Sequence, residues 1–140
     1  MFLKVITPRK IVIEKEIDSV ILPTVNGEIT VLPRHTHLIS LLKEGVITMK
    51  KDKQEEYLAV GGGYAETDGR HIQIMVSRAY NQDEIDEEIT KKAIQDAHQI
   101  LEKTKDKHER TEAASLLNRS VIDMKLLQKY RRRRPSSAPS

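Results

Sequence analysis

The chain contains no cysteine and no tryptophan, and it has only one phenylalanine and four tyrosines among its 140 residues. Without cysteine it can form no disulfide, no thiolate metal site and no thiol nucleophile. With so few aromatic side chains, a hydrophobic core must be built mainly from isoleucine, valine and leucine, a composition that favours strands. The composition therefore excludes thiol chemistry and indicates a β-rich domain.

Long hydrophobic runs are missing as well. No stretch approaches the roughly 20 apolar residues that a membrane-spanning helix needs, and residues 1–7 lack the apolar centre and cleavage site of a signal peptide. A chain of 140 residues can bury one modest core, as one domain or as a small domain with an appendage. We expect a cytosolic protein, or one held at a membrane through its partners.

Short apolar runs rich in isoleucine and valine fill the chain up to about Tyr80 and are interrupted by turn residues. Asn26-Gly27 and Asp68-Gly69 are the firmest turn signals, because these pairs tolerate the positive φ angles of tight hairpins. This pattern predicts an all-β sandwich or barrel with one buried face on each strand. The expected strands cover residues 2–7, 11–14, 17–22, 28–32, 38–42, 46–50, 56–60, 64–67 and 71–77.

The hydrophobic period changes after Tyr80. Spacings of three and four predict amphipathic helices over residues 83–102 and 111–130, with Asn81 or Asp83 as the first N-cap. The polar stretch 103–110 would join them into an antiparallel hairpin. The expected buried stripes are Ile85, Ile89, Ala93, Ala97 and Ile100, then Ala113, Leu116, Leu117, Val121, Met124 and Leu127.

The predicted fold is therefore α+β: a β domain over residues 1–82, a helical hairpin over 83–130 and a basic, disordered tail over 131–140. Charge is distributed unevenly over the last two parts. Residues 83–102 carry seven acidic residues and two lysines, whereas residues 103–134 carry eleven basic and four acidic residues. Such an asymmetry often marks a surface that meets a charged partner.

Local signals for catalysis are weak. His35 and His37 share one side of an extended segment, but no third ligand follows at a diagnostic spacing, so a structural or surface role is favoured over a metal site. No nucleophile elbow marks a Ser/His/Asp triad. Gly61-Gly62-Gly63 lacks the helix and lysine of a phosphate loop, which favours a bulge or close strand packing. Residues 84–88 are acidic but point in different directions around the predicted helix, as on a solvated face.

Several motifs, taken in order, resemble the epsilon subunit family of the F-type proton-translocating ATP synthase. Their order and spacing, with a helical hairpin after about residue 80, are jointly specific, and the resemblance covers about residues 1–130. The motifs are Leu3-Lys-Val-Ile-Thr-Pro8, Asp18-Ser-Val-Ile-Leu-Pro23, Gly27-Glu28-Ile-Thr-Val-Leu-Pro33 with His35 and Leu38, Lys43-Glu-Gly45-Val46, Val60-Gly-Gly-Gly-Tyr64 and Ile85-Asp86.

The resemblance implies a non-catalytic rotor subunit of the central stalk, which couples proton-driven rotation of the c-ring to ATP synthesis. Its β domain would contact the gamma subunit and the c-ring, with Glu28 facing the ring and His35, next to Arg34, near gamma. Its hairpin would fold on the β domain or extend to the alpha/beta catalytic head and restrain ATP hydrolysis. The basic residues expected to be attracted to acidic surfaces of the head are Arg119, Lys125, Lys129 and Arg131.

The resemblance also implies a peripheral location on the cytoplasmic face of an energy-transducing membrane, such as the bacterial plasma membrane, with no nucleic acid and only indirect membrane contact. Some family members bind ATP on the hairpin. This chain keeps Ile85 and Asp86 of that motif, but Ile89 and Thr90 replace its arginine and alanine, so a phosphate-pairing group is lost and no cofactor is expected. At two further positions this chain departs from the family pattern: Thr30 and Arg34 stand where the family usually has glycine.

Two other hypotheses compete with the rotor subunit. One is a free-standing nucleic-acid or anionic-lipid binder that uses the basic run 131–134, for which binding would fall steeply with salt. The other is a small enzyme that uses His35 and His37 around a metal.

Overall fold

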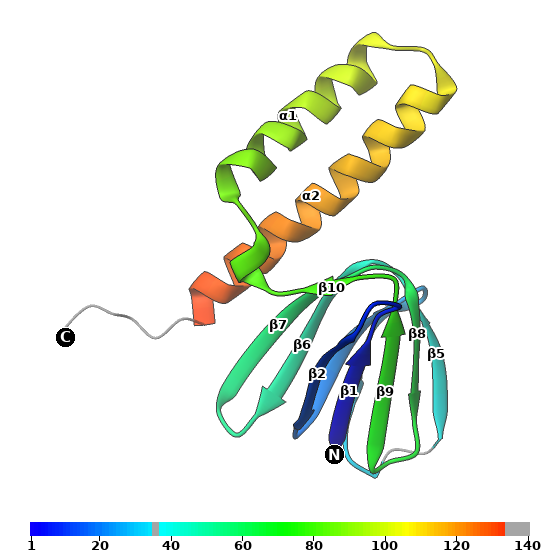
Figure 1. Ribbon diagram of the computed structural model, residues 1–140, viewed down its shortest axis with the longest axis vertical. Coiled ribbons are helices and arrows are strands. Elements are labelled where there is room, and N and C mark those ends of the chain that lie inside the picture. The colour runs from blue at the N-terminus through cyan, green and yellow to red at the C-terminus, as the bar shows by residue number, and fades with distance from the viewer. Residues whose placement is uncertain (35–36, 134–140) are drawn as a thin grey trace, which may run out of the picture.

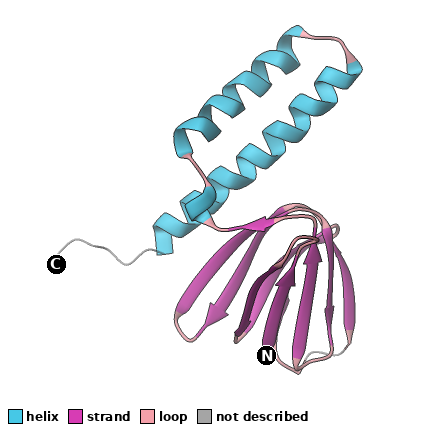
Figure 2. Cartoon of the chain, viewed as in Figure 1, coloured by secondary structure: helices cyan, strands magenta, loops and turns pink. Residues whose placement is uncertain are grey.

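The computed structural model describes residues 1–34 and 37–133, which form a β-sandwich followed by a helical hairpin (Figures 1 and 2). This confirms the predicted fold class. The strands are β1 (Phe2–Ile6), β2 (Ile11–Glu16), β3 (Ser19–Thr24), β4 (Gly27–Val31), β5 (Leu38–Leu42), β6 (Gly45–Lys51), β7 (Gln54–Val60), β8 (Gly63–Thr67), β9 (His71–Val76) and β10 (Ala79–Tyr80). A 3-10 helix, η1 (Gln82–Glu84), precedes the helices α1 (Glu87–Lys103) and α2 (Lys107–Arg133).

One continuous sheet forms the sandwich. Its strand order is β10-β7-β6-β3-β5-β8-β9-β1-β2, and β4 pairs with β3 beside this path. All neighbours are antiparallel except β1 and β9, which pair in parallel. The sheet folds over, so that Lys15 on the edge strand β2 forms an ion pair with Glu56 on β7 near the other edge. The first strand, β1, and the last long strand, β9, lie side by side, next to the edge strand β2.

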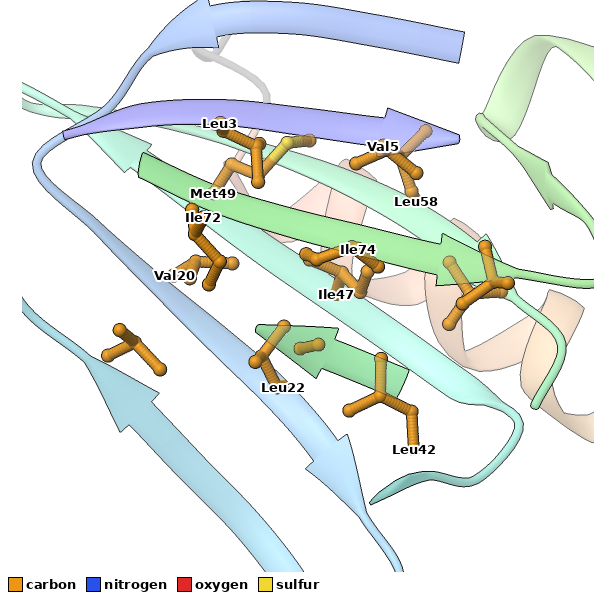
Figure 3. Close-up of a cluster of buried hydrophobic side chains, with 14 of the residues drawn as sticks. Leu3, Val5, Val20, Leu22, Leu42, Ile47, Met49, Leu58, Ile72 and Ile74 are labelled. Atoms are coloured by element: carbon orange, nitrogen blue, oxygen red, sulfur yellow. The ribbon is translucent and has the colours of Figure 1, made fainter. Parts of the chain in front are cut away.

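Alternation along the strands builds the core. On β9, Ile72, Ile74 and Val76 are buried while Gln73 faces solvent, as the sequence pattern predicts. Figure 3 shows the side chains of β1 and β9 pointing toward those of β3 and β6. Branched aliphatic side chains make up most of this core, and burying each contributes about 1.5–3 kcal/mol.

The glycine triplet serves close strand packing, as expected. A Cβ at Gly63 would lie 1.9 Å from the carbonyl oxygen of Met75, and one at Gly61 would lie 2.1 Å from Ser77 Oγ. At Gly62 the nearest atom would be the Leu42 carbonyl oxygen at 3.5 Å, an ordinary contact. The triplet thus lets β8 approach β9 and supplies no phosphate loop.

Gly63→Ala is expected to lower the free energy of unfolding by about 1–3 kcal/mol, because the backbone of β9 must move to admit the methyl group. Gly62→Ala should change it much less. Urea unfolding of both variants measures the difference. Equal losses in the two variants would contradict the packing role of Gly63.

The helix boundaries differ from those predicted. Asn81 caps η1, whereas Asp86 caps α1 by accepting the Ile89 N–H at 3.0 Å, so α1 begins at Glu87 and not at residue 83. The joint is also shorter than predicted, because Asp106 accepts the Glu109 N–H at 2.9 Å and starts α2 at Lys107. Polar residues with high helix propensity can extend a helix without any apolar periodicity.

At its other end, α2 continues to Arg133, so residues 131–133 are helical and the tail predicted from residue 131 begins too early. The remainder of that tail, residues 134–140, and His35 with its predicted gamma contact lie outside the described residues. Within the described residues, no helix is both long enough and apolar enough to cross a membrane.

The buried faces of the helices were only partly predicted. Ala97, Ala113 and Leu127 are buried as expected, but Ile89 is 69% exposed and Val121 50% exposed. Ile100 and Leu116 are exposed as well. The helix contact instead buries the small side chains Thr90, Ala97, Ala113 and Ser120. Small residues allow close approach of two helices, and hydrophobicity alone does not find them.

Candidate protein-docking site

A row of apolar side chains crosses the outer face of the sandwich. Ile6 on β1 pairs with Met75 on β9, Met75 with Tyr64 on β8, and Tyr64 with Leu41 on β5. Residues opposite one another on neighbouring strands point to the same face, so these four form what we call the outer apolar row. The Tyr64 hydroxyl donates to the Met75 sulfur at 2.9 Å, which holds the centre of the row together.

The outer apolar row is open to solvent. Leu41 is 64% exposed, and Ile39, two residues before it on the same strand face, is 71% exposed. The adjacent row on that face carries Lys4, Gln73 and Glu66. An exposed apolar strip with a polar border is typical of a protein-binding surface.

Glu28 and Arg34, both predicted contact residues, lie at opposite ends of β5. Glu28 lies at the start of β4, paired with Pro23 and next to the β3–β4 turn, where the Val25 N–H donates to the Leu41 carbonyl at 3.2 Å. Arg34 donates its N–H to the Gly69 carbonyl at 2.9 Å, beside the other end of the strand. Both side chains are exposed, but no single flat patch at one end of the sandwich contains both.

Arg34 has a φ angle of 66°, a left-handed conformation that glycine adopts at little cost. This explains physically why glycine suits the position. Thr30, in contrast, lies within β4 and has no positive φ angle.

The hairpin rests on the sandwich through a second hydrophobic cluster, the hairpin seat. Leu126 of α2 is fully buried against Val46 on β6 and Tyr57 and Ala59 on β7. Ile122 and Ile85 pack around its edge. Figure 1 shows the C-terminal part of α2 near the sandwich while α1 and the hairpin tip point away from it. Among the described residues, the helices therefore contact the sandwich mainly through the C-terminal part of α2.

Beside the seat, a polar cluster joins β10 to α2. The Tyr80 hydroxyl donates to Asp123 Oδ1, and we call this pair the hairpin latch. Arg119 and Arg78 both attract the Asp123 carboxylate, and Arg78 also donates to Glu44 Oε2 at 2.7 Å. The Arg78 Nε is buried without a hydrogen-bond partner among the described residues. A buried donor left unpaired costs free energy, which offsets part of the gain from the Arg78–Glu44 contact.

Burial at the latch shifts both pKa values upward. Desolvation raises the pKa of Asp123 above its usual 3.8, against the favourable Tyr80 hydrogen bond and the two arginines. Desolvation and then the Asp123 carboxylate raise the pKa of Tyr80 from 10.0 to about 12. Because the docked state favours the protonated phenol, the contribution of Tyr80 to docking is complete below pH 10 and is lost as the pH rises toward 12.

Ultraviolet titration of the tyrosines should therefore show a late phase near pH 12 to which Tyr80 contributes. Tyr80→Phe should reduce that late phase by one phenol, whereas Tyr64→Phe, which changes an exposed phenol, should leave it in place. If Tyr80→Phe leaves the late phase unchanged, the latch assignment is wrong.

The basic residues predicted to meet the catalytic head have different surroundings here. Arg131 donates to both carboxylate oxygens of Glu87 and so ties the end of α2 to the start of α1. This pairing lowers the pKa of Glu87 to about 2. Arg119 lies near Asp123, Lys125 is exposed, and Lys129 faces the sheet. They do not form one continuous surface in this arrangement.

Ile85 and Asp86, the two residues kept from the nucleotide-binding motif, both have structural roles. Ile85 packs at the hairpin seat and Asp86 caps α1. The Thr90 hydroxyl donates to the Asp86 carbonyl at 2.7 Å, and Ile89 points to solvent. As for metals, the described residues contain no group of three or more side chains suited to hold one.

An exposed apolar row on a β-sandwich, joined to a latched helical hairpin, defines an adaptor: a small docking subunit with a helical appendage. The family model for the β-sandwich domain of the ATP synthase delta/epsilon chain matches residues 1–82. The chain belongs to the family of ATP synthase epsilon chains.

The similarity to relatives extends through the hairpin. The epsilon chain of Geotalea uraniireducens is 34% identical over 132 residues, which cover 93% of this chain and 95% of the relative. That of Moorella thermoacetica is 34% identical over 88% of this chain and 92% of its own length. The chloroplastic epsilon chain of Oltmannsiellopsis viridis is 37% identical over 78% of this chain and 83% of its own length.

Solved structures share the fold. A chain of the Euglena gracilis mitochondrial ATP synthase, a structure of OSCP, F1 and the c-ring, has a TM-score of 0.69 at 18% identity and covers 93% of this chain and 78% of its own. A chain of the central stalk and c-ring structure from Tetrahymena thermophila has a TM-score of 0.57 at 11% identity, with 89% and 94% covered.

Sequence reasoning missed the outer apolar row, the seat residue Leu126 and the latch. One signal for the row was available, because residues 38–42 carry apolar side chains on both faces of the strand. A strand with a single buried face would instead alternate apolar and polar residues. Nothing local marked Tyr80 and Asp123 as partners, because they are 43 residues apart.

Proposed function

We propose that this chain is a non-catalytic central-stalk subunit of an F-type ATP synthase, in which the sandwich docks on the rotor and the hairpin restrains ATP hydrolysis. The observation that supports it best is the exposed outer apolar row on a chain of the epsilon family. The chemistry of ATP synthesis would reside on other subunits. This chain would transmit rotation driven by proton flow.

For docking, we assign the outer apolar row to the gamma subunit and Glu28 to the c-ring. The row offers the large apolar and aromatic side chains that dominate binding energy in protein interfaces. Glu28 is exposed at the start of β4, where a carboxylate keeps its hydration until a partner pairs with it. Arg34, toward the other end of the sandwich, would then contact gamma at its flank. We assign His35, the next residue in the sequence, to gamma as well.

For regulation, we assign the hairpin to a reversible contact with the alpha/beta head. Its attachment to the sandwich is narrow, since α2 alone supplies the seat residues Leu126 and Ile122. Release of the latch and the seat would free Arg119 and Lys129 for acidic surfaces, in addition to Lys125, which is already exposed. Arg131 would reach such a surface by exchanging its Glu87 partner for one on the head. This assigns residues 1–82 to docking and 83–130 to regulation, with α2 continuing to Arg133.

The location we propose is peripheral, on the cytoplasmic face of an energy-transducing membrane and, in a bacterial source, the plasma membrane. The relatives above include bacterial and chloroplastic epsilon chains. Washing membranes at low ionic strength should release the chain together with the other extrinsic subunits. If the chain left the membrane only in detergent, a peripheral location would be contradicted.

Co-purification tests the assignment directly. A tagged chain should recover gamma-type and catalytic ATP synthase subunits, and failure to recover them would refute the rotor role. For the hairpin, a chain ending at Tyr80 should assemble normally and raise ATP hydrolysis by the complex. A chain ending at Arg133 is the control, since it retains both helices. Unchanged hydrolysis with the shorter chain would refute inhibition while leaving docking intact.

A further inference from the structure

A basic hollow lies between the sheet and the last turns of α2. Its floor is a cross-strand row of Ile21 on β3, Thr48 on β6 and Tyr57 on β7. Its volume is about 250 Å³. The charged side chains that line it are Lys50 and Glu55 from the sheet and Lys129 and Arg132 from α2. We call these seven residues the basic hollow.

Cations outnumber anions in the basic hollow by three to one. Lys50 Nζ lies 3.6 Å from Glu55 Oε1, a long ion pair, and neither Lys129 nor Arg132 forms an ion pair with another described residue. Cations in the last turn of a helix can serve its negative end. That role does not explain Lys50, which comes from a different element and faces the same space.

We propose that the basic hollow binds a phosphate group. Three converging cationic side chains can each donate to a different oxygen of one compact, multiply charged anion. The volume suits orthophosphate or diphosphate better than an acidic helix. The binding residues are Lys50, Lys129 and Arg132. The site is separate from Ile85 and Asp86 and does not depend on the rotor role.

Because the basic hollow is built from both parts of the chain, a bound phosphate group would connect α2 to the sheet. Any ligand that binds only the docked arrangement stabilises that arrangement in proportion to the logarithm of its concentration. The phosphate group would therefore hold the hairpin on the sandwich, next to the Leu126 seat.

The test is a titration of the full chain with inorganic phosphate at constant ionic strength, followed by amide chemical shifts. We expect saturable shifts at Thr48, Tyr57 and Lys129 and a rise in melting temperature. Lys50→Gln and Arg132→Gln should each weaken binding about tenfold or more, the effect of losing one charge-assisted hydrogen bond. Lys51→Gln is the matched control for Lys50, because the neighbouring strand residue points to the opposite face.

A second arm identifies the source of the phosphate group. Vesicles that contain phosphatidylglycerol are compared with neutral phosphatidylcholine vesicles in sedimentation with the same variants. Lys50-dependent binding to the anionic vesicles, displaced by phosphate, identifies a lipid headgroup, and phosphate binding without vesicle binding identifies a free anion. The proposal is overturned if phosphate produces no saturable shift, or if Lys50→Gln and Lys51→Gln bind alike.

Discussion

Leu126→Asp is expected to release the helical hairpin from the sandwich while the sandwich stays folded. Leu126 is fully buried against Val46, Tyr57 and Ala59, and removing such a side chain costs about 2–5 kcal/mol. A carboxylate left without a partner in the same seat adds a desolvation cost. Because the seat is the main apolar contact between the two parts, we expect docking to fail. Amide hydrogen exchange should accelerate in α2 and remain slow in β1, β6 and β9.

Leu116→Asp is the matched control for this variant. Leu116 lies on the same helix but is 42% exposed, so the carboxylate remains hydrated and docking should persist. Slow exchange across α2 in Leu126→Asp would show that the seat does not hold the hairpin. In an assembled complex, release of the hairpin is also expected to change the rate of ATP hydrolysis. That rate tests the regulatory role of the hairpin, whereas hydrogen exchange tests only its packing on the sandwich.

The second large effect is expected at the outer apolar row. Leu41→Glu combined with Tyr64→Glu should weaken binding to a gamma-type subunit by at least about 100-fold, because two central apolar side chains are replaced by carboxylates that must be desolvated. Leu41 is exposed and Tyr64 partly so, so the free energy of unfolding should change little. Binding is measured by titration with purified gamma subunit and by recovery of the complex on the tagged chain.

A control for this pair is Gln73→Glu combined with Glu66→Gln. These residues occupy the adjacent polar row of the same strands, and the exchange keeps the net charge. Binding should remain near that of the unmodified chain. If both pairs of substitutions weaken binding equally, the row has no special role, and if neither does, gamma contacts another face.

Much of the sandwich could be predicted because its signals are local. The alternation of Ile72, Ile74 and Val76 marks a strand with one buried face, and Asn26-Gly27 marks a tight turn. The two amphipathic helices are equally visible. The first and last residues of the helices were harder to predict, because Asp106 starts α2 through a side-chain hydrogen bond that no apolar spacing reveals.

The docking site and the latch were beyond local signals. Ile6 meets Met75 only because β1 and β9, at opposite ends of the domain in sequence, pair in parallel. Ile89 was predicted to be buried and is exposed, since the close contact of the helices used Thr90 and Ala97 instead. Hydrophobicity gives the amount of apolar surface on a helix, and packing selects the face.

The absence of cysteine, the scarcity of aromatic residues and the strand and helix periods by themselves determined an α+β chain without thiol chemistry, because these properties depend on residue type and spacing alone. Tertiary structure decided which apolar side chains stay outside as a docking row, where Leu126 attaches the hairpin, and that Tyr80 meets Asp123. Those outcomes depend on contacts between residues far apart in the chain, and each contact is set by strand register and helix packing.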